Sequence, residues 1–378
     1  MLKIIRYVVR FIPVLIMIAV TFFSVFSASE ARLEEEIKLQ ISRINELEQL
    51  YSQGEIKSVD EASFFEGDLQ AELASGIKFN ELSFIATHNS YQTESIDEMK
   101  KLYGYISELT FGLVGDDPAY YSSETLTEQL NCGIRSFEID IETFERDGEI
   151  SFTCMHSPYF EMGTSCYDFS LALKEIAMWS ENNPDHLPIT MIIEPKRVFV
   201  PLEDMKFFKM KYALALDDLL REGLGEKLFT PADMLRDYES FGEMRRADDW
   251  CKVEKMLGKV VIILHDCGVT EDYIKLDPSI KSQAMFPMLR QGDLDRDCAS
   301  VILCNNPVEL NKMTENLKEK KILSRTRSDK FGGVTQKKYD MAMSGCAQII
   351  STDYPPKTTS GEDDYVVSFN GKTVRKAK

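Results

Sequence analysis

Short apolar runs alternate with amphipathic stretches over most of the chain. The amphipathic stretches at 170–183, 205–225 and 306–321 predict helices, because their apolar residues recur at helical spacing. The short runs predict eight strands, at 82–88, 134–142, 150–156, 188–194, 259–265, 300–305, 321–326 and 347–352. Strands that alternate with helices pair in parallel, and eight of them favour an α/β fold, a closed (β/α)8 barrel of the TIM type.

A different pattern precedes the barrel, at residues 30–75. This segment is polar except for apolar residues at three- and four-residue spacing, which predict an amphipathic N-terminal helical extension. These apolar residues are Leu33, Ile37, Ile41, Ile44, Leu47 and Leu50. We expect the helix to pack on the main domain or to pair with another chain.

The first 29 residues have the arrangement of an export signal. Lys3, Arg6 and Arg10 form a basic start, 11–26 is an apolar run, and small residues follow at 27–29. The run is shorter than the roughly 20 residues that a membrane-spanning helix needs. We therefore predict a cleaved signal and a secreted or periplasmic protein, with an uncleaved membrane anchor as the alternative. The predicted boundaries are 1–29 for the signal peptide, 30–75 for the helical extension, 76–356 for the barrel and 357–378 for a C-terminal tail.

Charge and composition narrow the possible partners. The 378 residues include 44 basic and 62 acidic side chains, a formal charge of −18, which excludes nucleic acid as a partner. The same charge argues against general attraction to anionic membranes, so any lipid contact has to be local and apolar. The sequence indicates no stable protein partner.

The eight cysteines are compatible with disulfides in an exported chain. Cys154 and Cys166 flank one loop and are the first pair to test. No C-x-x-C spacing occurs, which argues against a zinc ribbon or a thioredoxin-type motif.

Polar residues stand at the ends of several predicted strands. They are His88 and Asn89 after the first strand, Glu138 and Asp140 on the second, His156 on the third, Glu194 on the fourth with Lys196 beyond it, and Asp353 and Tyr354 after the eighth. Each has a structural interpretation on its own, such as a turn residue or a helix cap. Together they indicate an active site, because the carboxyl ends of the strands form the catalytic face of such barrels.

The chemistry of this set points to a cation and a phosphate ester. Asn89, Glu138, Asp140 and Glu194 offer only oxygen ligands, which suit calcium or magnesium. The histidines remain available for proton transfer near neutral pH. His265 ends the fifth strand and is a further candidate for the mouth, whereas His186 lies at the opposite, structural end of the barrel.

At this point the chain resembles the phosphatidylinositol-specific phospholipase C superfamily, and in particular its exported, calcium-dependent bacterial branch. The resemblance rests on IATHNSY, TLTEQLNCGIRSFEIDIE, CMHSP and PITMIIEPK, and continues through LFTPADML, GKVVIIL, ILCNNP, ILSRTRSD and SGCAQIISTDYP. It spans about residues 78–356. It implies a distorted TIM-type barrel that cleaves the glycerol–phosphate bond of phosphatidylinositol, or of a glycosylated relative, at a membrane surface.

The resemblance also implies roles for individual residues. His88 would stabilise the transition state, His156 would be the general acid, and Glu138 a general base. The implied calcium ligands are Asn89, Glu138, Asp140 and Glu194, and the implied substrate contacts are Lys196, Arg325, Arg327 and Tyr354. Of the two arginines, only one is expected to point inward.

Two other functions compete with this one. A glycerophosphodiester phosphodiesterase shares the barrel, the E-x-D pair and two histidines, but usually opens with a histidine-arginine-glycine turn where this chain has His88-Asn89-Ser90. A barrel that has lost catalysis and binds lipid or glycan is the rival from another class. The presence of both histidines and all acidic ligands argues against it.

Overall fold

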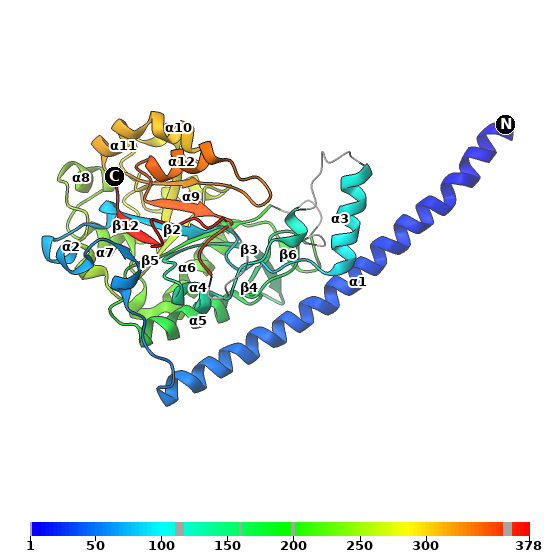
Figure 1. Ribbon diagram of the computed structural model, residues 1–378, viewed down its shortest axis with the longest axis horizontal. Coiled ribbons are helices and arrows are strands. Elements are labelled where there is room, and N and C mark those ends of the chain that lie inside the picture. Colours follow the sequence, from blue (N-terminus) through cyan, green and yellow to red (C-terminus); the bar gives the residue numbers. More distant parts are fainter. Residues whose placement is uncertain (1, 110–116, 159–160, 198–200, 358–364) are drawn as a thin grey trace.

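In the computed structural model, which describes residues 2–109, 117–158, 161–197, 201–357 and 365–378, eight parallel strands close into a barrel (Figure 1). Each strand pairs with the next, and the last pairs with the first. The strands are β2 (Leu82–Thr87), β3 (Ser136–Arg146), β5 (Ile189–Pro195), β7 (Val260–Leu264), β8 (Phe286–Arg290), β9 (Val301–Leu303), β10 (Leu323–Arg327) and β11 (Ile349–Thr352). The closed sheet confirms the predicted TIM-type barrel.

Burial on both faces of the wall explains the apolar runs. β5 reads ITMIIEP and β7 reads VVIIL, and their side chains are buried except at Glu194, near the carboxyl end of β5. Parallel strands covered by helices outside and packed side chains inside have no solvent face, so apolar residues follow one another instead of alternating. Polar side chains are therefore conspicuous where the strands end, at the barrel mouth.

Helices connect the strands and cover the outside of the barrel. They are α2 (Leu69–Ser75), α3 (Asp97–Leu109), α4 (Leu126–Asn131), α5 (Phe169–Asn182), α6 (Met210–Leu224), α7 (Pro231–Leu235), α8 (Phe241–Arg246), α9 (Thr270–Leu276), α10 (Pro307–Lys312), α11 (Thr314–Lys320) and α12 (Gln336–Ser344). Several begin at side chains that cap the first turn. Asp168 accepts hydrogen bonds from the backbone N–H groups of Ser170 and Leu171, which fixes the start of α5.

The predicted set of barrel strands included one strand that lies outside the barrel and lacked one that belongs to it. The run at 150–156 forms β4 (Glu149–Cys154), which is not a barrel strand but returns antiparallel along the extended outer half of β3. The missing barrel strand is β8, from the segment between the predicted fifth and sixth strands that had no strand assigned to it. β8 has five residues including Pro287, too short a pattern to be distinguished from a loop. A two-residue strand, β6 (Met205–Lys206), also pairs with β3.

The N-terminal residues form one long helix, α1 (Leu2–Gln53), which runs along one side of the barrel and extends beyond it (Figure 1). The amphipathic stretch at 33–50 lies within it, with Ile44 and Leu47 buried and α5 as a packing partner. Cleavage of the predicted signal peptide stays a prediction. Among the described residues, no helix combines the length and apolar character that crossing a membrane requires.

The end of the chain joins the sheet beside the first barrel strand. β12 (Val374–Lys376), in the segment predicted as a tail, pairs antiparallel with β2 and parallel with β1 (Phe65–Glu66).

The cysteines, all within the described residues, form no disulfide: all eight are free thiols. Cys154 and Cys166, the pair proposed as a possible bridge, are both buried.

Candidate active site

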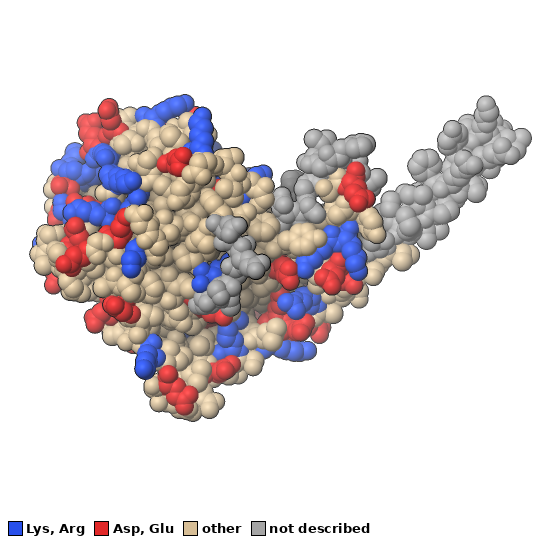
Figure 2. All heavy atoms as spheres, in the orientation of Figure 1, with Lys and Arg blue, Asp and Glu red and all other residues tan. Residues whose placement is uncertain are grey.

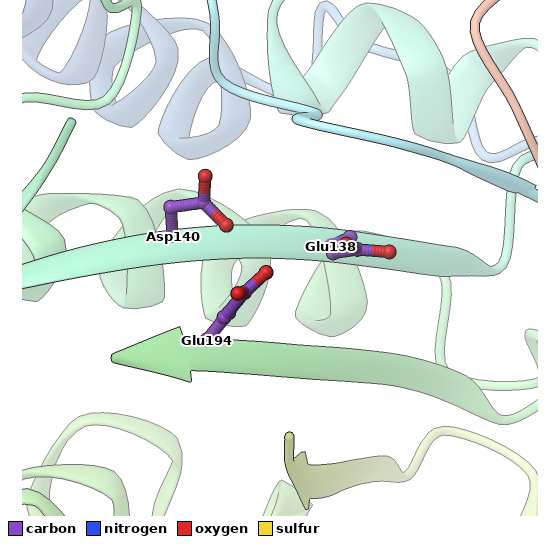
Figure 3. Close-up of side chains that lie close together, drawn as sticks. All are labelled: Glu138, Asp140 and Glu194. Atoms are coloured by element: carbon purple, nitrogen blue, oxygen red, sulfur yellow. The ribbon is translucent and has the colours of Figure 1, made fainter. Parts of the chain in front are cut away.

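Three carboxylates meet at the barrel mouth. Figure 3 shows Glu138 and Asp140 on β3 and Glu194 on the neighbouring β5. Each offers an oxygen atom within 4.8 Å of the other two. The two-residue spacing on β3 brings the first two to the same side of the strand, and the parallel register sets Asp140 opposite Glu194. This group could hold a metal ion.

Several buried side-chain oxygen atoms have no hydrogen-bond partner among the described residues, and two of them belong to the proposed metal ligands. These two are Oδ1 of Asn89 and Oδ1 of Asp140. Asn89 adopts a left-handed conformation (φ 46°) and donates from Nδ2 to Oε1 of Gln92 at 3.0 Å, which fixes its amide. Buried polar atoms normally have a partner, and unpaired oxygens suit a hard cation. The oxygen atoms present therefore fit a calcium site.

Lys196 lies against the acidic group. Its Nζ is 2.9 Å from Oδ2 of Asp140 and 3.3 Å from Oε2 of Glu194. Burial alone would lower the pKa of Lys196, but the two carboxylates outweigh it and raise that pKa. Burial and the negative charge of Glu194 raise the pKa of Asp140, while Lys196 opposes the rise. The charged form of Asp140 is thus disfavoured by burial and by Glu194 even with the lysine beside it.

Glu138 is paired with a second cation inside the barrel. Its Oε2 forms a buried ion pair with Nη2 of Arg325, which also donates to Oγ of Ser351 at 3.1 Å. Burial would raise the pKa of Glu138, but Arg325 and then His88 hold it at about 2. The Glu138 side chain is therefore anionic throughout the neutral range, as a metal ligand has to be.

His88 is oriented by a carboxylate from the neighbouring strand end. Its Nδ1 lies 2.8 Å from Oδ1 of Asp353, and its Nε2 is 3.8 Å from Oε1 of Glu138. Arg327 is held by Oδ2 of Asp353 at 2.9 Å and has Nη1 3.3 Å from Nε2 of His88. Because Asp353 accepts the proton of Nδ1, the lone pair of the neutral ring is on Nε2.

His156 has a carboxylate partner of its own. Nδ1 of His156 lies 2.5 Å from Oε2 of Glu161. Burial would lower the pKa of His156, but Glu161 and Asp140 together raise it above its usual value. β4 brings His156 to the mouth: it runs back along β3 and ends with Cys154 opposite Ile141, next to Asp140. A histidine with a raised pKa is suited to donate a proton.

The expectation that only one of two arginines points inward was wrong. Arg325 and Arg327 both lie at the mouth. Arg325 forms an ion pair with Glu138, and Arg327 forms one with Asp353. Residues two apart on a strand face the same side, so the spacing itself requires this arrangement. Tyr354 stacks on Phe331 with ring centroids 5.9 Å apart at 16°, which builds an aromatic rim beside His88 and Asp353.

The sequence did not identify three further site residues, and it placed Asp353 at the mouth without giving it a role. Asp353 was expected at a strand end, but its contact with His88 was not predicted. Thr352 pairs with Thr87, so the residues that follow them, Asp353 and His88, lie side by side. Glu161 lies in a loop, and Asn305, which accepts a hydrogen bond from Nη1 of Arg325, lies just beyond the end of β9. Glu142 follows Asp140 on the same side of β3; it is buried, and burial and the charge of Asp140 raise its pKa to about 8.

The other two histidines lie at the edge of the site and away from it. His265 lies close enough to contribute to the low pKa of Glu138, and its Nδ1 is 3.1 Å from the carbonyl oxygen of Asp266. His186 is buried far from the mouth, bonded to Oγ of Ser180 at 2.8 Å, and burial lowers its pKa to about 3. His186 is thus a structural residue, whereas His265 stands at the edge of the site.

These features define a barrel with two histidines near an acidic group that could hold a cation. Comparison with known proteins gives the class of enzyme. The family model described as phosphoinositide phospholipase C, Ca2+-dependent, matches residues 142–378, and the chain belongs to this family. The protein is accordingly a calcium-dependent phosphoric diester hydrolase of the phospholipase C type. No curated protein sequence matches the chain.

Solved structures show the same fold. One is a calcium-dependent phosphoinositol-specific phospholipase C from Pseudomonas sp., in a myo-inositol complex: it is 15% identical, with a TM-score of 0.56 over 84% of this chain and 100% of that one. Another is a calcium-dependent phosphatidylinositol-specific phospholipase C from Streptomyces antibioticus, also 15% identical, with a TM-score of 0.51 over 73% of this chain and 94% of that one. At this identity the likeness establishes the barrel architecture.

Proposed function

We propose that the barrel mouth cleaves the glycerol–phosphate bond of phosphatidylinositol, or of a glycosylated relative, at a membrane surface. The inositol 2-hydroxyl oxygen attacks phosphorus, the bond from phosphorus to the glycerol oxygen breaks, and the products are a cyclic inositol phosphate and diacylglycerol. The observation that carries the proposal is that two histidines near the acidic group each have a carboxylate at Nδ1, Asp353 for His88 and Glu161 for His156.

The residues that would hold calcium are Asn89, Glu138, Asp140 and Glu194. Their unpaired or mutually repelling oxygens support this assignment. Bound there, calcium would stabilise negative charge on the phosphoryl oxygens and lower the pKa of a coordinated hydroxyl. Lys196 and Arg327 supply further positive charge at the rim, within reach of a phosphate.

Proton transfer divides between the two histidines. His156 donates a proton to the departing glycerol oxygen, and its raised pKa keeps it protonated near neutrality. Glu138 is a weak base because both of its oxygens face cations or His88. The lone pair on Nε2 of His88 is the better acceptor for the 2-hydroxyl proton, in addition to its role beside the phosphate.

The remaining assignments concern substrate and cell location. Tyr354, on its aromatic rim, would pack against the inositol ring, and Arg325 acts through Glu138. On the face in Figure 2 the basic side chains lie among acidic ones and form no separate basic surface, and we propose that lipid contact is local and apolar. We keep residues 1–29 as an export signal, 30–75 as the extension and 76–356 as the catalytic domain of a secreted or periplasmic enzyme.

The direct test is turnover of phosphatidylinositol vesicles with and without metal. A chelator should abolish turnover and added calcium should restore it. His88→Ala and His156→Ala should each lower kcat by about 10²- to 10⁴-fold, with thermal unfolding unchanged. Full turnover in excess chelator, or near-normal turnover of either variant, contradicts the proposal.

A further inference from the structure

The face of α1 that lies on the barrel carries a polar stripe. Glu36 is 4% exposed, Gln40 is 1% exposed, and Arg43 is partly buried. Because these residues are four and three positions apart, they lie on one side of the helix, and the apolar Ile44 and Leu47 follow on the same side. An amphipathic helix that only needed to dock would bury apolar side chains here, since buried polar groups cost free energy unless they are bonded.

Two of these residues hold the backbone of the segment that follows Glu161. Gln40 bonds both backbone groups of Asp168: its Nε2 donates to the carbonyl at 2.9 Å, and its Oε1 accepts from the N–H at 2.8 Å. Nη2 of Arg43 donates to the carbonyl oxygen of Ser165 at 2.6 Å and to Oε2 of Glu175 on α5 at 3.0 Å.

Glu36 joins two loops of the barrel mouth. One carboxylate oxygen accepts from Oγ1 of Thr93 at 2.6 Å, and the other from the backbone N–H of Thr164 at 2.7 Å. Thr93 is four residues after Asn89, in the loop that begins with His88. Thr164 is three residues after Glu161, the partner of His156. A single buried side chain of α1 thus bonds to both loops that carry the proposed catalytic histidines.

The two loops also pair with each other. The N–H of Thr93 donates to the carbonyl of Gly163 at 3.2 Å, and the N–H of Ser165 donates to the carbonyl of Tyr91 at 2.8 Å. They approach so closely that a β-carbon at Gly163 would lie 2.6 Å from the carbonyl oxygen of Thr93. The polar stripe of α1 packs on the outer side of these two paired loops.

We propose that α1 is part of the catalytic apparatus, with Glu36 as a positioning residue that fixes Glu161 and thereby the ring of His156. The role rests on the proposed function, in which His156 protonates the glycerol oxygen. A displacement of about 1 Å in a catalytic group can cost about a hundredfold in rate. Loss of the Glu36 contacts should therefore lower the rate of acid-assisted cleavage.

Two substrates separate positioning from general stability. Phosphatidylinositol has an alkoxide leaving group that needs a proton, whereas an inositol phosphodiester of 4-nitrophenol has a leaving group that departs without one. Glu36→Ala should lower kcat about tenfold or more on phosphatidylinositol, and much less on the nitrophenyl ester. Glu36→Gln, which keeps the shape and an acceptor for Thr164, should recover most of the rate. Glu34→Ala, on the exposed side of α1, is the matched control.

His156→Ala is the reference, because loss of the acid itself has to show the same leaving-group preference. If His156→Ala shows the preference and Glu36→Ala does not, or loses both activities equally, the positioning role is overturned while the acid assignment stands. If His156→Ala shows none, the acid assignment fails and the role of Glu36 fails with it. Should Glu36→Ala not fold, Thr93→Val, which removes only the hydroxyl that donates to Glu36, carries the same expectation.

Discussion

Each of the two histidines at the mouth depends on a carboxylate that is not itself a metal ligand. Asp353 accepts from Nδ1 of His88, and Glu161 lies against Nδ1 of His156. The two rings differ in their other neighbours: Arg327 lies beside His88, whereas Asp140 and Glu161 raise the pKa of His156 against the effect of burial. The raised pKa suits His156 to donate a proton.

The pairing of His156 with Glu161 predicts a shift in the pH profile. His156 acts in its protonated form, so activity falls as pH rises through its pKa, which Glu161 and Asp140 raise against the effect of burial. Glu161→Gln removes part of this support and should move the basic limb of the kcat profile to lower pH. Steady-state kinetics across pH would measure it. A limb that stays in place, or moves to higher pH, argues against the pairing.

The pairing of His88 with Asp353 predicts a large loss without unfolding. Asp353→Asn keeps the size of the side chain but no longer selects the Nδ1–H tautomer, so kcat should fall by about a hundredfold or more. Thermal unfolding serves as the control, because Asp353 also accepts from the backbone N–H of Phe331. Retention of near-normal kcat would exclude a role for this tautomer.

At the scale of elements, the unusual length of β3 sets up the site. β3 continues past the barrel rim, and β4 returns along it, so a hairpin that is no part of the barrel delivers His156. Sequence alternation predicted that Glu138 and Asp140 share a side, because that depends on strand geometry alone. It could not predict Glu161, whose position depends on loop packing, or β8, whose five residues include a proline.

The close approach of the two mouth loops predicts a steric penalty. Gly163→Ala places a β-carbon against backbone oxygens of Thr93 and Glu94, which cannot rotate away, and should destabilise the fold by about 1–3 kcal/mol. Gly104→Ala is the matched control: it lies within α3 with no atom nearby, and should stabilise by roughly 0.5–1 kcal/mol. Chemical denaturation measures both. Equal effects of the two substitutions would contradict the close packing at Gly163.

For the whole molecule, calcium should act as a stabilising ligand. The acidic group is part of the folded barrel and is dispersed in the unfolded chain, so binding favours the native state, by about 2.7 kcal/mol at a hundred times Kd. Thermal unfolding in calcium should therefore occur at higher temperature than in chelator. Asp140→Asn should lose most of this difference, while Asp218→Asn, an exposed acid on α6, should keep it. A calcium shift that survives Asp140→Asn would place the ion elsewhere.

Barrel, acidic group and paired histidines converge on one chemical claim, that the inositol 2-hydroxyl is the nucleophile. Phosphorus NMR of phosphatidylinositol turnover, followed from the first minutes in the presence of calcium, tests this claim most directly. A cyclic inositol phosphate should form before any linear phosphate. A linear phosphate appearing first would contradict intramolecular attack and favour a glycerophosphodiester phosphodiesterase.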